Sequence, residues 1–216
     1  MEYGAVVLCG GRSSRMGLAK ATLPFGAEPM LRRVVRLLGQ TVGVIVVAAG
    51  PKQELPELPP EVRVVRDRQE GRGPLEGLYA GLSGLPQHVD AAYVTGCDVP
   101  LLVPAFVVRM LELLDEYAIA VPVRDARHYP LAAVYRRSVL GAIKTLLAAD
   151  RPRPAFLFDM VRTRRVTADQ LIEVDPELTT LENLNRPSEY LRALARAGFT
   201  PSPGVLRAFA GKSADP

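Results

Sequence analysis

Short apolar runs alternate with helix-like segments through the first 150 residues of the chain. The runs carry Val, Ile, Leu and Ala at most positions, which is typical of strands that are buried on both faces. Such alternation predicts an α/β fold with three layers, in which helices flank a mostly parallel, Rossmann-like central sheet. We expect strands at residues 3–9, 42–49, 62–67, 91–96, 118–123 and 129–137, and helices at residues 29–41, 74–85, 103–117 and 138–150.

The rest of the chain is less regular. Residues 162–167 and 171–174 read as short strands, and residues 187–198 read as a closing helix that ends at a glycine. A chain of 216 residues has the size of one domain. We therefore expect a single domain over residues 1–199 and a C-terminal tail over residues 200–216.

The composition favours an ordered protein with small anionic ligands. Hydrophobic residues make up 48% of the chain, and the mean hydropathy is +0.10, which argues against disorder. The net charge is +4, the chain has no Trp, and basic and aromatic residues are not interleaved as in single-strand binders. We expect no nucleic-acid partner.

No segment approaches the ~20 apolar residues of a membrane span. The N-terminus does not read as a secretory signal, so we expect no membrane partner and a cytoplasmic location. The two cysteines, Cys9 and Cys97, form neither a disulfide framework nor a zinc pattern. They stand at the ends of the first and fourth predicted strands, which are neighbours in a doubly wound sheet. We expect two reduced, buried thiols side by side.

Residues 8–20, LCGGRSSRMGLAK, directly follow the apolar run YGAVV at residues 3–7 and begin with the last two residues of the first predicted strand. Glycines let backbone amides face a ligand, and successive amides bind anions. Arg15 and Lys20 add positive charge that suits triphosphate oxygens. The spacing matches neither the Walker A loop nor the dinucleotide fingerprint. The alternative is a solvated strand-to-helix turn.

Open parallel sheets bind ligands beyond the carboxyl ends of their strands. Besides the glycine-rich loop, Asp67 follows the third predicted strand and Asp98 follows the fourth. A carboxylate opposite a phosphate loop suits Mg²⁺, which prefers one or two carboxylates together with phosphates and water. Alternatively, Asp98 caps the next helix, because Asp is a good N-cap and Pro100 stands where helices often begin.

Taken together, these features resemble those of a known family. Residues 8–20 resemble the signature L-x-G-G-x-S-x-R-M-G-x-x-K of the molybdenum cofactor guanylyltransferases. Four later segments resemble further motifs of that family in the same order, and the matches span most of residues 5–192. They are GPLEGL at 73–78, CDVP at 97–100, YPLAAVY at 129–135 and NLNRPSEY at 183–190.

The resemblance implies a nucleotidyltransferase fold and a nucleotidyltransferase activity. Members of the family move GMP from GTP onto the phosphate of Mo-molybdopterin, which yields the guanine dinucleotide cofactor and pyrophosphate. They need Mg²⁺. GTP and Mo-molybdopterin are therefore the implied substrates, and a molybdenum insertion protein and molybdoenzyme chaperones are further partners that the resemblance suggests.

The resemblance also assigns roles to residues. Arg15, Lys20 and Asp98 would be catalytic, with Asp98 as the metal ligand. Asn183 and Asn185 would close the site near the metal or the pterin, unless they form only a turn or a helix cap. The residues implied to contact GTP are Leu8, Cys9, Gly10, Gly11, Lys20, Asp67, Gly73, Pro74, Leu75, Gly77 and Asp98.

The implied chemistry suits these residue types. The attacking phosphate oxygen is already anionic at neutral pH, so no general base is needed. Positive charge and loop amides would stabilise the reacting α-phosphate. Of the two histidines, we expect His88 on the surface, whereas His128 lies near the implied site and is a weaker candidate for a phosphate contact.

Three positions depart from the family pattern. Cys9 stands where many members have Ala, and because Cys is also small we expect this change to be tolerated. Glu76 also stands where the family has Ala. The Glu76 carboxylate would either accept hydrogen bonds from guanine or point to solvent. Ala48 or Ala49 stands where some members place a polar Asn, so guanine specificity is less secure than nucleotidyl transfer.

Three alternatives to guanylyl transfer stay open. One is cytidylyl transfer to the same cofactor, although Gly10 and Gly11 and the segment 73–78 favour guanine. Another is a nucleotide-binding adaptor that holds molybdopterin without turnover, and the presence of both Lys20 and Asp98 disfavours it. The third is sugar-nucleotide synthesis, whose loop usually carries Thr-Arg-Leu after the glycines.

Overall fold

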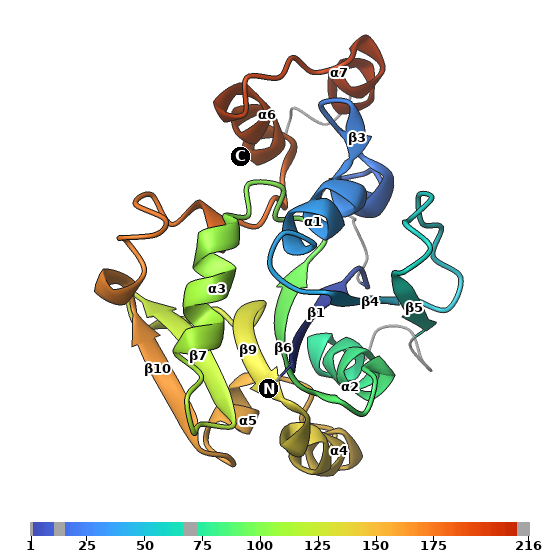
Figure 1. Cartoon of the computed structure of the whole chain (residues 1–216). Coiled ribbons are helices and arrows are strands. Elements are labelled where there is room, and N and C mark those ends of the chain that lie inside the picture. The colour runs from blue at the N-terminus through green and yellow to red at the C-terminus, as the bar shows by residue number, and fades with distance from the viewer. Residues whose placement is uncertain (1, 11–15, 67–72, 211–216) are drawn as a thin grey trace.

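The computed structural model describes residues 2–10, 16–66 and 73–210. Within these ranges eight strands form one sheet in the order β10-β7-β9-β6-β1-β4-β5, with β8 paired to β7 (Figure 1). β1 is parallel to β4 and β6, β4 to β5, and β7 to β10, so the predicted mostly parallel sheet is confirmed. The strands are β1 (Glu2–Leu8), β4 (Val44–Ala49), β5 (Arg63–Arg66), β6 (Val89–Gly96), β7 (Ile119–Arg124), β8 (Arg127–His128), β9 (Ala132–Arg136) and β10 (Thr163–Thr167).

Helices cover both faces of the sheet, which confirms the three layers (Figure 1). Alternate residues of a strand face opposite layers. In β1, Ala5 and Val7 pack in the cluster that includes α1 and α3. Val6 and Leu8 pack in the cluster that includes α2, α4 and α5. These helices are α1 (Met30–Leu38), α2 (Pro74–Gly84), α3 (Pro104–Glu112), α4 (Leu140–Ala148) and α5 (Ala155–Phe158).

β9 runs antiparallel to both of its neighbours, β6 and β7. The reason is the short connection that precedes it. Asp125 and Ala126 take positive φ values of 50° and 60° and form a tight turn, after which β8 pairs antiparallel with β7. A parallel strand would need a crossover of about a dozen or more residues, and residues 125–131 are too few for one.

The strand predicted at residues 171–174 is wrong, because this segment forms consecutive turns. The Leu171 amide donates to the Ala168 carbonyl at 2.9 Å, and the Val174 amide donates to the Leu171 carbonyl at 3.1 Å. Leu171 alone is fully buried here, whereas Ile172 is exposed. The backbone amides of this segment therefore bond to carbonyls a few residues earlier in the chain, and not to a neighbouring strand of the sheet.

A third apolar cluster lies beyond the main layers and joins both ends of the chain. It contains α6 (Pro187–Arg196) and α7 (Pro203–Ala210), which lie together beside the small hairpin β2 (Pro24–Phe25) and β3 (Glu28–Pro29) (Figure 1). The predicted closing helix is thereby confirmed as α6. The stretch expected as a tail contains α7, whose Val205 and Phe209 are buried in the cluster.

The described helices are also informative about membranes. Across residues 2–10, 16–66 and 73–210, no helix combines the length and the apolar character that crossing a bilayer requires.

Cys9 and Cys97 are neighbours, as the predicted strand order requires. β1 and β6 pair in parallel, and the Cys97 amide donates to the Leu8 carbonyl at 3.1 Å. Both thiols are free and buried. A hydrogen bond with the Cys97 side chain, together with burial, raises the pKa of the Cys9 thiol well above its ordinary value.

The backbone of α2 approaches β1 closely at Gly81. A Cβ atom built on Gly81 would lie 2.2 Å from Cγ1 of Val6, a fully buried side chain in the middle of the sheet. Any side chain at this position would push the helix off the strand. Gly141 of α4 offers a contrast, because a Cβ atom there would meet nothing within 4 Å.

We predict that Gly81→Ala lowers the free energy of unfolding by about 1–3 kcal/mol, although Ala is the better helix former. The cost comes from the overlap with Val6. Urea denaturation followed by circular dichroism measures it. Gly141→Ala is the matched control, for which we expect no loss and a gain of up to ~1 kcal/mol. Equal effects of the two substitutions would show that α2 does not pack this closely.

We predict that Cys9 in the folded protein reacts slowly with iodoacetamide and that its rate stays low as the pH passes ~8.5, the ordinary thiol pKa. Because its folded pKa is raised, the thiol stays protonated where an ordinary cysteine becomes a thiolate. Peptide mapping by mass spectrometry follows Cys9 separately from Cys97. In guanidinium chloride the same residue should regain an ordinary profile, and rapid modification of the folded protein at pH 8 would contradict the assignment.

Candidate active site

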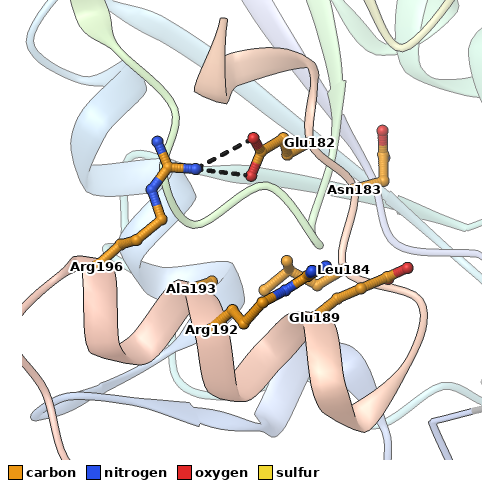
Figure 2. Close-up of a pocket in the computed structure, with 7 residues that line it drawn as sticks. All are labelled: Glu182, Asn183, Leu184, Glu189, Arg192, Ala193 and Arg196. Carbon is orange, nitrogen blue, oxygen red and sulfur yellow. Dashed lines mark hydrogen bonds and ion pairs between the residues drawn. The ribbon is translucent and has the colours of Figure 1, made fainter. Parts of the chain in front are cut away.

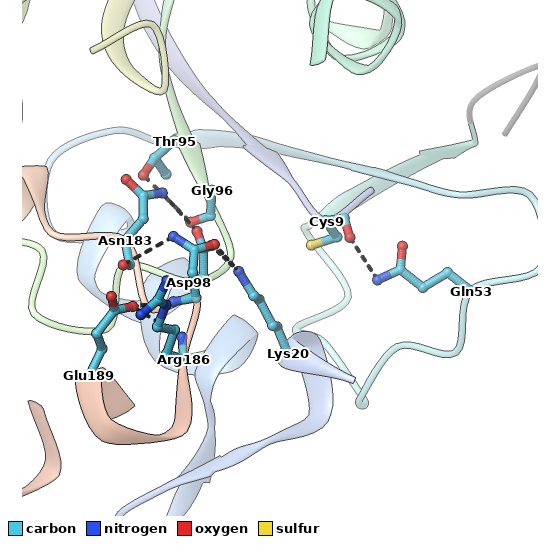
Figure 3. A network of polar contacts seen from close by, with 10 residues as sticks. Cys9, Lys20, Gln53, Thr95, Gly96, Asp98, Asn183, Arg186 and Glu189 are labelled. Atoms are coloured by element: carbon cyan, nitrogen blue, oxygen red, sulfur yellow. Dashed lines mark hydrogen bonds and ion pairs between the residues drawn. The ribbon is translucent and has the colours of Figure 1, made fainter. Parts of the chain in front are cut away.

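The candidate site lies where β1 and β6, two neighbouring parallel strands, reach their carboxyl ends. β1 leads into Cys9 and Gly10, and β6 leads into Cys97 and Asp98. The topology thus brings the opening loop and the aspartate to the same edge of the sheet, as the sequence predicts. Figure 3 shows the polar contacts at this edge.

Asp98 lies at the centre of these contacts (Figure 3). Its Oδ2 accepts a hydrogen bond from Lys20 Nζ at 2.6 Å, and its Oδ1 accepts one from Asn183 Nδ2 at 3.0 Å. The Lys20 and Asp98 side chains are only 17% and 13% exposed, so the ion pair is largely shielded from solvent. A Cβ atom on Gly96 would lie 2.4 Å from Asp98 Oδ1, which explains why a glycine precedes this turn.

Lys20 bridges distant parts of the chain. It is the last residue of the glycine-rich segment 8–20 and the first residue of a short 3₁₀ helix, Lys20–Thr22. Besides Asp98, its Nζ donates to Asn185 Oδ1 at 2.8 Å. The one ammonium group therefore links residues that are 78 and 165 positions away in sequence.

Asn183 and Asn185 flank Leu184, which anchors the closing segment. The Leu184 amide donates to the Asp98 carbonyl at 2.9 Å, and its side chain is buried in the third cluster. The asparagine side chains bind Asp98 and Lys20, while Glu189 caps α6 by accepting from the Asn185 and Arg186 amides at 2.7 and 3.1 Å. The interpretation of this pair as only a turn or cap is wrong.

The interpretation of Asp98 as a helix cap is also wrong. α3 begins at Pro104, and its N-cap residue is Val103, which has no side-chain hydrogen bond to the helix. The Val103 amide donates to Thr180 Oγ1 at 3.0 Å. Asp98 instead directs both carboxylate oxygens to Lys20 and Asn183.

Gln53 belongs to the site edge, although sequence reasoning missed it. Its Nε2 donates to the Cys9 carbonyl at 2.8 Å, and its Oε1 accepts from the Gly50 amide at 3.1 Å (Figure 3). Arg66, at the end of β5, holds the same turn by donating to the Gly50 and Gln53 carbonyls at 2.9 and 2.7 Å. A lone glutamine in a polar turn carries no pattern that reveals this contact.

The segment 73–78 forms the start of α2. Gly73 is the N-cap residue with a φ of +83°, which favours glycine, and Pro74 is the first helical residue. Leu75 and Gly77 are buried. Glu76 is only 8% exposed, so it does not point to solvent, and no hydrogen bond or ion pair to its carboxylate is found among the described residues.

Three predicted site residues, Gly11, Arg15 and Asp67, lie outside the described residues. Leu8 ends β1 with its side chain in the core, and Gly10 is exposed just beyond it. The structure therefore brings Cys9, Lys20, Asp98 and the two asparagines to one edge, with the start of α2 at the same end of the sheet.

Neither histidine makes a hydrogen bond or ion pair with Lys20, Asp98 or the two asparagines among the described residues. His88 is exposed and faces Glu2 at the amino end of β1, with its Nε2 3.7 Å from Oε2, as expected of a surface residue. His128 lies in β8 with its ring 5.3 Å from that of Phe158. Its Nε2 is buried and has no hydrogen-bond partner among the described residues.

A hollow of about 380 Å³ adjoins the site on the far side of Asn183, between residues 182–184 and α6 (Figure 2). Arg196, on its wall, is paired with Glu177 and Glu182. Arg192 and Glu189 contribute one further charge of each sign. The hollow has mixed charge and offers no concentrated positive field for a triphosphate.

The donor set of the site fits a hard divalent cation. No group of three or more His, Cys, Asp or Glu side chains that would hold a metal occurs in the described parts of the chain. A single carboxylate flanked by two amide side chains matches Mg²⁺, which takes one or two carboxylates and fills its shell with phosphates and water. The Lys20 ammonium against Asp98 shows that this carboxylate already attracts a cation.

The sequence is similar to known proteins over most of its length. The chain is 33% identical over 197 residues to a probable molybdenum cofactor guanylyltransferase of Pelotomaculum thermopropionicum, covering 91% of this chain and 94% of that protein. It is 35% identical over 193 residues to a protein of the same name from Methanothermobacter thermautotrophicus, covering 85% and 94%.

Solved structures share the fold. Molybdopterin-guanine dinucleotide biosynthesis protein A from Archaeoglobus fulgidus superposes with a TM-score of 0.75 at 18% identity, over 90% of this chain and 98% of that one. A Mycobacterium tuberculosis protein solved as a complex with manganese superposes with a TM-score of 0.57 at 15% identity, over 82% and 100%. Residues 5–166 match the MobA-like NTP transferase domain, and the chain belongs to this family.

Proposed function

We propose that this protein transfers GMP from GTP to the phosphate of Mo-molybdopterin, forming the molybdopterin guanine dinucleotide cofactor and releasing pyrophosphate. The similarity to molybdenum cofactor guanylyltransferases over 91% of the chain supports this activity. The observation that carries it is the contact of Lys20, Asp98, Asn183 and Asn185 at the carboxyl end of β6.

In this proposal GTP lies along the edge formed by Cys9 and Gly10, with its phosphates toward Lys20. The Lys20 ammonium would neutralise phosphate oxygens, and Asp98 would hold Mg²⁺. Gly11 and Arg15 would contact the phosphates, and Asp67 and the segment Gly73–Gly77 would lie toward the nucleoside. Gly11, Arg15 and Asp67 take these roles from the family resemblance alone. The positive end of α2 points its free amides to the same edge, which favours an anion.

The reaction is an in-line displacement. A phosphate oxygen of the acceptor forms a bond to the α-phosphorus of GTP, and the bond from that phosphorus to the bridging oxygen of the β-phosphate breaks. Pyrophosphate leaves with that oxygen, and no proton must be removed from the attacking group. The chain's contribution is to align the two phosphates and to neutralise charge that develops between them.

Magnesium would supply a further positive charge at the reacting phosphate. Asp98 would hold it, with Asn183 and Asn185 as neutral neighbours. A Mycobacterium tuberculosis protein of the same fold was solved as a complex with manganese, which supports the use of a divalent metal. The asparagines also carry the closing segment that would face the acceptor.

We predict that the purified protein transfers label from α-³²P-GTP to molybdopterin in the presence of Mg²⁺, because its relatives are named guanylyltransferases. Product formation with GTP and with CTP is measured in parallel. The same fold occurs in a cytidylyltransferase from Thermus thermophilus, with a TM-score of 0.65 at 16% identity, so the CTP arm is a real competitor. Faster transfer from CTP would overturn the guanine assignment, and no transfer from either nucleotide would indicate an adaptor.

We predict that Asp98→Asn lowers the Mg²⁺-dependent rate by on the order of 10²–10³, because one charged contact to the reacting centre is lost. The amide keeps the size of the side chain, so the fold should persist in circular dichroism. Asp169→Asn, which removes a carboxylate from the start of the 3₁₀ helix Ala168–Gln170, is a matched control and should retain full activity. Full activity of Asp98→Asn would remove Asp98 from the reaction.

Two further expectations accompany the proposal. A molybdenum insertion protein and molybdoenzyme chaperones would deliver the substrate and receive the product. A cytoplasmic location also stays a prediction.

A further inference from the structure

The charge of Asp98 is balanced by a side chain of the protein itself. Lys20 Nζ lies 2.6 Å from Asp98 Oδ2, and the pair is largely buried. Asn183 donates to the other carboxylate oxygen at 3.0 Å. A divalent cation that approaches Asp98 would therefore meet the Lys20 ammonium group and the Asn183 amide N–H. The ion pair of Lys20 and Asp98 has no net negative charge to attract it.

We propose that Lys20 keeps divalent metal away from Asp98 until a nucleoside triphosphate binds, so that metal and nucleotide enter the site together. The triphosphate offers several negative charges to Lys20, which then exchanges the carboxylate for phosphate oxygens. Asp98 is thereby released for the metal. This inference rests on the proposed function, because it assigns an order of binding to the same site.

The contacts of Lys20 make such an exchange feasible. A lysine has a flexible four-carbon stem and a compact charge. Lys20 is the first residue of a three-residue 3₁₀ helix, whose N-cap residue Ala19 makes no side-chain cap. Its second partner, Asn185 Oδ1 at 2.8 Å, is a neutral acceptor that costs less to leave than a second carboxylate would.

Asn183 takes a different part. Its Nδ2 contact fixes the orientation of the carboxylate without neutralising its charge. When Lys20 moves, Asp98 stays in place and presents a free Oδ2. Lys20 is therefore the group that sets metal access, and Asn183 is a positioning residue.

The test measures metal binding in the absence of any nucleotide or molybdopterin. Mn²⁺ is titrated into the free protein, and unbound Mn²⁺ is followed by electron paramagnetic resonance. Removal of a positive charge within a few ångströms of the metal should tighten Mn²⁺ binding by about tenfold or more, even after discounting for solvent screening. We expect the unaltered protein to bind Mn²⁺ weakly. We expect Lys20→Met to bind Mn²⁺ at least about tenfold more tightly.

Three controls locate the effect. Lys20→Arg keeps the charge and should bind Mn²⁺ as weakly as the unaltered protein. Lys144→Met removes an equal charge from an exposed position on α4, in the layer across the sheet from α1, and should change nothing. Adding Asp98→Asn to Lys20→Met should abolish the gain. Circular dichroism confirms that each variant is folded.

Each outcome decides the proposal. It is overturned if the unaltered protein already binds Mn²⁺ as tightly as Lys20→Met, if Lys20→Arg gains as much as Lys20→Met, or if the gain survives loss of the Asp98 carboxylate. Because no GTP is present, failure of guanylyl transfer leaves this result untouched. Conversely, a protein that transfers GMP without the Mn²⁺ gain would keep the proposed function and lose this inference.

Discussion

The ion pair of Lys20 and Asp98 is the interaction on which the rest of the site depends. It joins the end of the glycine-rich loop to the end of β6, and Asn183 and Asn185 attach the closing segment to the same two side chains. Both charges are largely shielded from water, and an unpaired charge in such a shielded position is costly. Each partner therefore needs the other, or a ligand that replaces it.

The fold supplies the conditions for that pair. β1 and β6 are central strands, so the loops that follow them are held by a rigid sheet with helices on both faces. The pairing of β1 with β6 fixes their separation. Gly81 lets α2 approach Val6 of β1 closely, and Gly96 leaves room for the Asp98 carboxylate. Gln53, in the turn after β4, donates a hydrogen bond to the Cys9 carbonyl. This bond connects the first residues of the opening loop to the turn after β4.

Much of this arrangement could be predicted from the sequence, because it depends on periodicity and strand order. The apolar runs around Val6 and Val94 identify central strands, and their order predicts that Cys9 and Cys97 meet. The asparagines could be placed near the site only through the family resemblance, since their partners are far away in sequence. The orientation of β9 depends on the local turn at Asp125, which apolar spacing does not reveal.

Other features depend on tertiary contacts that leave no local pattern. Gln53 resembles any polar turn residue until its carbonyl partner is known. Residues 171–174 have strand-like composition, but only Leu171 has a core to enter. The sequence allows Glu76 to lie either at a guanine edge or in solvent. Its neighbours bury it, so the position in solvent is excluded.

The third apolar cluster has a consequence for how the protein is made. Met16 and Phe25 from the beginning of the chain pack with Leu184, Tyr190 and Phe209 from its end. During synthesis the ribosome must therefore deliver residues 184–209 before the segment that carries the asparagines can pack against residues 16–30. An emerging chain that stops before residue 183 would contain the glycine-rich loop and Asp98 but would lack this segment, so the binding edge is complete only after these later residues have been made.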